Sequence, residues 1–196
     1  MKQVNKEKGA ILTNPGICAQ CDALNRSCCT LRAENNDGLP APVSGSEINR
    51  ILNLFPDQKK TDFLEGKINS DQFIRQMELL FPDRVDAVQT VFLPGQLHFE
   101  LKTTDDACIF KASDGCRLPD DVRPLFCRIY PFWFFDDAPH IFQDLNCLAL
   151  DQRQTIPEVF LSLGTKPEKL KQIHARICED WGLYHSIPLE KKRLFL

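Results

Sequence analysis

Apolar side chains recur at the spacing of an amphipathic helix in two segments of the first half of the chain. The first helix is predicted to begin at Ser44, because Glu47 follows three positions later as in a capping box, and to end before Pro56. Its apolar face comprises Ile48, Ile51, Leu52 and Phe55. The second helix is predicted to begin at Ser70 and to end before Pro82. Its apolar face comprises Phe73, Ile74, Met77, Leu80 and Phe81.

The spacing changes to a strand-like alternation in the middle of the chain. Over residues 97–102 apolar and polar side chains alternate, and Pro94-Gly95 supplies a turn after the apolar segment 88–93. This pattern predicts a hairpin that pairs residues 88–93 with residues 97–102, and it places His98 on the polar face.

A second tight turn is predicted at residues 113–115, and no internal repeat is found. The last helix is predicted over about 165–185, where Thr165 and Glu168 have the spacing of a capping box. Its apolar face comprises Leu170, Ile173, Ile177, Trp181 and Tyr184. The chain is therefore predicted to be an α+β protein. We expect a single small domain over residues 1–196, with helices at both ends around short hairpins and a cysteine-ligated metal centre.

The composition is that of an ordinary folded protein. Apolar residues make up 43% and charged residues 26% of the 196 residues. The net charge of −3 does not favour a general nucleic-acid-binding surface. No apolar run approaches the roughly 18 residues of a membrane span, and residues 1–16 lack the apolar segment of a signal peptide. We therefore expect a cytoplasmic protein without nucleic-acid or membrane partners, in a compartment where thiols stay reduced.

Eight of the nine cysteines fall into two groups. The N-terminal group, spaced C-x2-C-x6-C-C, comprises Cys18, Cys21, Cys28 and Cys29. The central group, placed at predicted turns and element ends, comprises Cys108, Cys116, Cys127 and Cys147. Two residues between cysteines form a tight turn that aims both sulfurs at one metal ion, and turn amides donate hydrogen bonds to thiolates. We expect these eight cysteines to hold one or two metal centres.

The adjacent pair Cys28-Cys29 bears on how the ligands are shared. Neighbouring side chains point to opposite faces of a strand and about 100° apart on a helix, so one metal ion rarely binds both. Either the two sulfurs serve different metal centres, or one serves a metal and the other is structural or reactive.

Three other interpretations compete with metal binding by all eight cysteines. They are a set of disulfides, a set of buried apolar thiols, and a single site that uses the N-terminal group alone. The remaining cysteine, Cys178, lies beside the apolar face of the last predicted helix, and we expect it to be a semi-buried core residue.

The segment of residues 123–132 reads R-P-x-x-C-R-x-Y-P-F, and it is preceded by the segment Gly115-Cys116-Arg117-Leu118 and by the N-terminal C-x2-C. In this order of motifs the chain resembles the YkgJ-type cysteine-cluster proteins, which are described as zinc- or iron-chelating and are related to flagellin lysine N-methylases. The resemblance runs over residues 18–147, two thirds of the chain. It implies that all eight cysteines of the two groups form the metal site.

The residues around Cys127 suit a metal centre on physical grounds as well. A zinc ion or a [4Fe–4S] core held by four thiolates carries a net charge of about −2, so cations are expected beside it. Arg123 and Arg128 flank Cys127 and are candidates to neutralise this charge or to bind an anionic substrate. Tyr130 belongs to the aromatic residues that we expect to keep water from the metal.

Two functions are compatible with these residues. The first is a metal-binding protein with one or two cysteine-ligated centres, redox or structural, with an iron–sulfur cluster slightly preferred over zinc. The second is a protein-modifying enzyme related to flagellin lysine N-methylases, although neither a G-x-G-x-x-G motif nor a P-loop is present. Metal ions are the expected partners, and a protein partner or protein substrate is compatible with either function.

Overall fold

The computed structural model describes residues 20, 21, 24, 29, 41–105, 107–113, 115–142, 147–150 and 155–184. The α-helices of this part are α2 (Gly45–Leu54), α3 (Lys60–Phe63), α4 (Asp71–Leu80), α5 (Val85–Val91), α6 (Leu125–Ile129), α7 (Ile156–Ser162) and α8 (Pro167–Asp180). Short 3-10 helices are η1 (Pro82–Arg84) and η2 (Leu148–Leu150). The strands form antiparallel pairs: β1 (Leu64–Ile68) with β2 (Leu97–Leu101), β3 (Thr103–Thr104) with β4 (Ala107–Cys108), β5 (Lys111–Ala112) with β6 (Gly115–Cys116), and β7 (Phe132–Phe135) with β8 (Ala138–Ile141).

The two helices predicted in the first half are confirmed. The Ser44 hydroxyl accepts a hydrogen bond from the backbone N–H of Glu47 at 3.3 Å, and the Glu47 carboxylate accepts one from the backbone N–H of Ser44 at 2.7 Å, which completes the capping box of α2. Helix α4 is capped by Ser70, whose hydroxyl accepts from the backbone N–H of Phe73 at 3.2 Å. The apolar faces of both helices are turned into the interior.

The predicted hairpin of residues 88–93 with 97–102 is wrong. Residues 85–91 form helix α5, because Val88 and Phe92 lie four positions apart and are both buried, which is helical spacing. Strand β2 pairs instead with β1, where Leu101 lies opposite Leu64. The missed strand contains Gly66, which weakens a strand signal.

His98 is buried rather than placed on a polar face as predicted. Its ring stacks on Phe73 at a centroid distance of 3.8 Å. Its Nδ1 lies 2.7 Å from Asn69 Oδ1, and its Nε2 lies 3.4 Å from Glu100 Oε1. The hydrogen bonds to these two side chains replace those that the imidazole loses on burial, so His98 is a core residue with its polar atoms satisfied.

The last helix is shorter than predicted. Helix α8 begins at Pro167 after the N-cap residue Lys166, so the expected capping box of Thr165 with Glu168 is not formed. The predicted buried residues Leu170, Ile173 and Ile177 are confirmed. Tyr184 is exposed, contrary to the prediction, whereas Leu183 is fully buried. The backbone turns at Gly182, which has a positive φ of 65°, and this turn ends the helical periodicity before residue 184.

Buried side chains gather in two clusters. The first core cluster lies between α4, α5, α6, α8 and β7, and its fully buried members include Met77, Phe81, Phe132, Trp133, Leu170 and Ile177. The second core cluster lies between α2, β1 and the cysteine hairpins, and comprises Val43, Ile48, Ile51, Phe63, Leu64, Phe110 and Leu118. Cys178 is buried in the first core cluster, which confirms its predicted core position.

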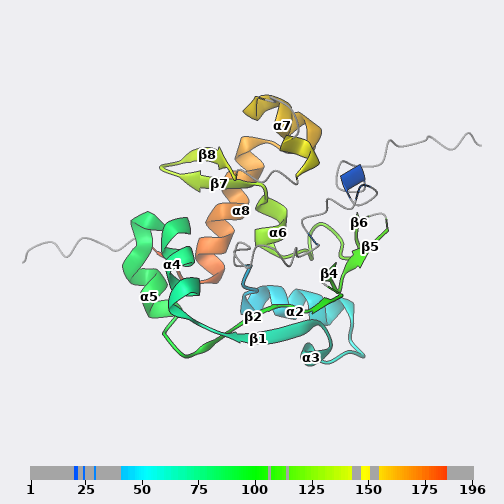
Figure 1. Cartoon of the computed structure of the whole chain (residues 1–196), viewed down its shortest axis with the longest axis vertical. Helices are drawn as coiled ribbons and strands as arrows, with labels where there is room; N and C mark the ends of the chain where they lie inside the picture. Colours follow the sequence, from blue (N-terminus) through cyan, green and yellow to red (C-terminus); the bar gives the residue numbers. More distant parts are fainter. Residues whose placement is uncertain are drawn as a thin grey trace, which may run out of the picture.

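The overall architecture is α+β, as predicted from the change in hydrophobic spacing. Figure 1 shows α8 at the centre, with α4 and α5 to one side and the small hairpins of β4, β5 and β6 to the other. Strands β5 and β6 pair on either side of the second predicted turn, with Ala112 opposite Gly115. The single-domain organisation stays a prediction. Of the helices in the described part, none is both long and apolar enough to traverse a bilayer.

Candidate metal centre

Two consecutive hairpins carry two of the predicted ligands at equivalent positions. Cys108 ends β4 opposite Thr103, and Cys116 ends β6 opposite Lys111. The following residues repeat the same backbone contact, since the N–H of residue 109 donates to the oxygen of residue 102 at 3.0 Å and that of residue 117 to residue 110 at 2.8 Å. The sequence analysis missed this repeat because it is only eight residues long.

The sulfurs of both hairpin cysteines accept a backbone hydrogen bond from the residue two positions later. The N–H of Phe110 donates to Cys108 Sγ, and the N–H of Leu118 donates to Cys116 Sγ. Phe110 and Leu118 are themselves buried in the second core cluster. The core therefore fixes two amides that point at sulfur, an arrangement that stabilises thiolate ligands in metal sites.

Cys29 joins this pair from a distant part of the sequence. The backbone N–H of Cys108 donates a hydrogen bond of 2.8 Å to the carbonyl oxygen of Cys29. The thiol of Cys29 lies near enough to raise the pKa values of Cys108 and Cys116 by charge repulsion. One cysteine of the N-terminal group is thus placed beside two of the central group.

Cys127 is presented by the short helix α6. Pro124 is the N-cap residue of this helix, and Leu125, Phe126 and Ile129 bury its apolar face in the first core cluster. Cys127 lies two residues after Leu125, near the start of the helix. A proline lies on either side of α6, since Pro124 precedes Leu125 and Pro131 follows the C-cap residue Tyr130.

We call Cys29, Cys108, Cys116 and Cys127 the cysteine tetrad. Burial raises the pKa of Cys127, and the charges of the other three members raise it further. Burial is also the main cause that raises the pKa of Cys108 to about 11 and that raises the pKa of Cys116. The four thiols are therefore electrostatic neighbours, and the raised pKa values of Cys108, Cys116 and Cys127 keep these three thiols protonated near neutral pH.

Within the described residues, no three His, Cys, Asp or Glu side chains are arranged to hold a metal ion. The members of the tetrad are neighbours without being drawn together into a closed cage. Their chemistry nevertheless fits a thiophilic metal, because four thiols with mutual repulsion, limited water and sulfur-directed amides become favourable ligands once their protons are lost. No disulfide joins any of the seven described cysteines to another.

Two arginines lie near enough to the tetrad to act on its thiols. The charge of Arg123 lowers the pKa values of Cys116 and Cys127, and the charge of Arg117 lowers those of Cys108 and Cys116, against the larger effect of burial. Arg128 Nε is buried and makes no hydrogen bond with the part of the chain that the structure describes. A buried guanidinium nitrogen of this kind calls for an acceptor, and a negatively charged thiolate centre is one.

An exposed carboxylate lies among these cations. Asp120 lies 4.0 Å from Arg123, 3.9 Å from Arg128 and 3.4 Å from Lys169, measured from its oxygens to the nearest side-chain nitrogens. Because Asp120 is exposed and two of these distances are long, solvent weakens its pairs with these cations.

The other predicted ligands lie elsewhere or outside the described residues. Cys21 Sγ accepts a hydrogen bond of 3.3 Å from the backbone N–H of Leu148, which places it next to Cys147. Cys147 packs against the first core cluster. Cys18 and Cys28 fall outside the described residues. The structure thus associates Cys21 with Cys147, and Cys29 with the other central cysteines.

Comparisons with known proteins leave the chain without an assigned family. No family model matches it. Neither the curated proteins nor the solved structures give a match. The resemblance to the YkgJ-type cysteine-cluster proteins therefore stays a prediction that rests on the cysteine motifs.

The remaining predicted residue is Tyr130. It is half-buried, and its ring stacks on Phe142 at a centroid distance of 6.3 Å. Two residues important for the tetrad were missed by the sequence analysis, Arg117 and Glu47. Arg117 directly follows Cys116, so its proximity to sulfur was available from the sequence. The role of Glu47 depends on a contact with Leu125, far along the chain, and only the fold shows it.

Proposed function

We propose that this chain is a metal-binding protein whose centre is held by the cysteine tetrad. The observation that carries the proposal is the mutual effect of the four thiols on one another's pKa values, although their positions in the sequence run from residue 29 to residue 127. Buried thiols that repel one another are costly to keep together unless a cation binds them.

The donor set narrows the metal to a zinc ion or an iron–sulfur cluster. Four thiolates suit both, whereas calcium and magnesium require oxygen ligands. When bound, zinc would supply structural stability and an iron–sulfur cluster would supply one-electron transfer. The amides of Phe110 and Leu118 would donate to the ligand sulfurs, and Arg117 and Arg123 would offset the negative charge of the centre.

We also propose a second metal centre, near Cys21 and Cys147. Cys21 Sγ accepts a hydrogen bond from the backbone N–H of Leu148, the residue that follows Cys147. This contact supports the hypothesis that the adjacent cysteines 28 and 29 serve different centres. The tetrad is the better supported of the two, because all four of its members lie within the described residues.

The proposal is tested by measuring metal content after anaerobic purification. Each tetrad cysteine is replaced by serine, and Cys178→Ser is the matched control, because Cys178 is a buried thiol of the first core cluster. We expect each tetrad variant to lose the same centre and Cys178→Ser to keep it. A brown protein with broad visible absorbance identifies an iron–sulfur cluster, and a colourless protein with bound zinc identifies a structural site. Wild-type chain that contains no metal and takes up neither zinc nor iron with sulfide would refute the proposal.

A further inference from the structure

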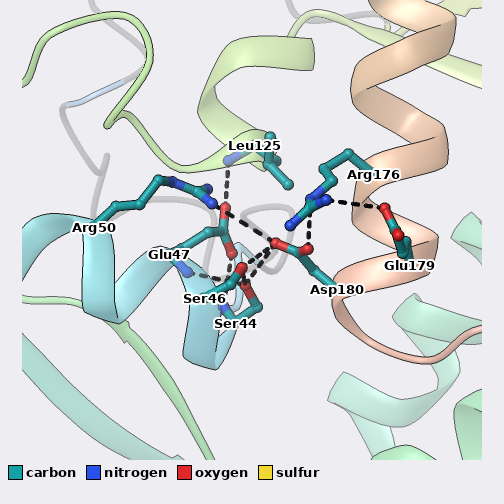
Figure 2. A network of polar contacts seen from close by, with 8 residues as sticks. All are labelled: Ser44, Ser46, Glu47, Arg50, Leu125, Arg176, Glu179 and Asp180. Atoms are coloured by element: carbon teal, nitrogen blue, oxygen red, sulfur yellow. Dashed lines mark hydrogen bonds and ion pairs between the residues drawn. The ribbon is translucent and has the colours of Figure 1, made fainter.

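A fully buried carboxylate joins the start of α2 to the helix that carries Cys127. Glu47 has no exposed surface, although charged side chains are rarely buried to this extent. One of its oxygens accepts from the backbone N–H of Ser44 at 2.7 Å. The other accepts from the backbone N–H of Leu125 at 2.6 Å. Figure 2 shows Glu47 between the start of α2 and the start of α6.

The second of these hydrogen bonds is not needed for capping α2. Glu158 occupies the same capping-box position in α7, and its carboxylate accepts only from Thr155, the N-cap residue of its own helix, among the contacts seen in the described part. Glu158 is also exposed. Glu47 therefore caps α2 through the N–H of Ser44 and, in addition, accepts a hydrogen bond from the first residue of α6.

The helix that Glu47 holds is the one that carries Cys127. Helix α6 has five residues, so it has few internal hydrogen bonds, and its first N–H groups have no partner within the helix. The apolar side chains of α6 fix which face meets the core, and the bond from Leu125 fixes where the helix starts. Cys127 follows two residues later on the same turn, so a shift at Leu125 moves its sulfur.

Glu47 is in turn fixed by a network at the end of α8. The hydroxyls of Ser44 and Ser46 donate to Asp180, whose carboxylate also receives a hydrogen bond from Arg176 Nε at 2.6 Å. Arg50 Nη1 lies 4.0 Å from Asp180 Oδ2. Figure 2 shows these side chains converging between α2 and α8. The start of α2, and with it Glu47, is anchored at its N-cap.

From these contacts we infer that Glu47 is a positioning residue for the metal centre, setting the place of Cys127 through the backbone of Leu125. This inference rests on the proposed function. Removing an outer residue that orients a metal ligand weakens metal affinity by about 10- to 100-fold. The Glu47→Ala variant should therefore bind metal more weakly and with altered sulfur coordination.

The test is a Co²⁺ titration of the full-length, metal-free chain under anaerobic, reducing conditions. Tetrahedral thiolate coordination gives Co²⁺ an intense near-ultraviolet charge-transfer absorption, so affinity and geometry are read together. Glu47→Ala is compared with Glu158→Ala, the matched capping glutamate. We expect Glu47→Ala to weaken Co²⁺ binding by about 10- to 100-fold and to change the absorption. The control variant Glu158→Ala should bind as the wild type does.

A second variant keeps the test valid if Glu47→Ala does not fold. Glu47→Gln retains one carbonyl acceptor for two N–H donors, and we expect a smaller loss of affinity in the same direction. Wild-type binding by folded Glu47→Ala or Glu47→Gln, or an equal loss in Glu158→Ala, overturns the positioning role and leaves the proposed function intact. A wild-type chain that binds no Co²⁺ and takes up neither zinc nor iron with sulfide overturns both.

Discussion

The backbone N–H of Cys108 donates a hydrogen bond of 2.8 Å to the carbonyl oxygen of Cys29. These residues belong to different cysteine groups in the sequence, and the contact brings the two groups together. It places Cys29 with the hairpin cysteines, while Cys21 lies beside Cys147. The tetrad therefore combines cysteines from both sequence groups, instead of each group forming a site of its own.

The adjacent cysteines provide the first prediction. If Cys29 belongs to the tetrad and Cys28 does not, the serine variants of these two cysteines should lose metal from different centres. We expect Cys29→Ser to lose the tetrad centre, and Cys28→Ser to keep it, because adjacent side chains diverge. Metal content per chain, measured by elemental analysis, gives the result. Identical and complete loss in both variants would instead indicate one cooperatively assembled site.

The second prediction concerns metal removal. Cys108 and Cys116 pack against the second core cluster, whereas Met77 and Trp133 belong to the first. Since metal binding contributes to folding free energy, chelation should loosen the cysteine hairpins more than the first cluster. Hydrogen exchange measures this directly, and the amides of Phe110 and Leu118 should lose protection. Equal protection of these amides with and without metal would show that the centre is not structural.

The third prediction concerns the arginines beside Cys127. The charge of Arg123 lowers the pKa values of both Cys116 and Cys127, against the larger effect of burial. We expect Arg123→Leu to weaken metal retention by about tenfold and Arg128→Leu to weaken it less. For an iron–sulfur cluster the reduction potential should fall, because a lost positive charge disfavours the added electron.

Competition with a chelator measures retention for both variants. Lys171→Leu is the control, since Lys171 is exposed and pairs with Asp137 at 3.0 Å. Unchanged retention and potential in both single variants and in the double variant would remove this role. Intact metal with a loss of any catalytic activity would point to substrate capture by the arginines.

The fourth prediction concerns pH. Burial among Phe81, Trp133 and Phe134, followed by the charge of Arg84, lowers the pKa of His174 to about 4, from an ordinary value of 6.5. Asp83 and Asp137 act in the opposite direction. Between these two pKa values the unfolded chain binds a proton that the folded chain does not, so stability should fall as the pH falls through this window.

The expected loss from His174 is about 2 kcal/mol between about pH 7.5 and about pH 5. Urea unfolding of the wild type and of His174→Phe at both pH values measures it, and the difference between the two proteins isolates His174 from the carboxylates. A wild-type free energy of unfolding that changes no more than that of His174→Phe would contradict the low pKa.

Local patterns predicted local structure well. The capping residues Ser44 and Ser70 and the apolar faces that follow them lie within a few positions of one another, so the sequence was sufficient to place α2 and α4. The pairing of β1 with β2 joins residues more than twenty-five positions apart, and no local pattern specifies it. Residues 88–93 were misassigned to a strand because a short apolar run fits both a helix and a strand.

The residue types of the candidate site could be predicted from the sequence, but the contacts between these residues could not. Cysteine spacing predicted the candidate ligands, and the position of Arg123 in the sequence predicted it as a neighbour of Cys127. It also grouped Cys29 with Cys21, because both lie in one short segment, whereas in the fold Cys29 contacts Cys108 and Cys21 contacts Leu148. Glu47 was predicted only as a cap, since its bond to Leu125 spans 78 positions of sequence.

The most direct test of the tetrad is X-ray absorption at the edge of the bound metal, measured on a chain in which Cys18, Cys21, Cys28 and Cys147 are all replaced by serine. This variant keeps the tetrad and Cys178, which lies in the first core cluster. We expect one metal centre per chain with four sulfur ligands at each metal, at about 2.3 Å for zinc. A variant that binds no metal, or a metal shell made mainly of nitrogen and oxygen, would contradict the assignment of the tetrad.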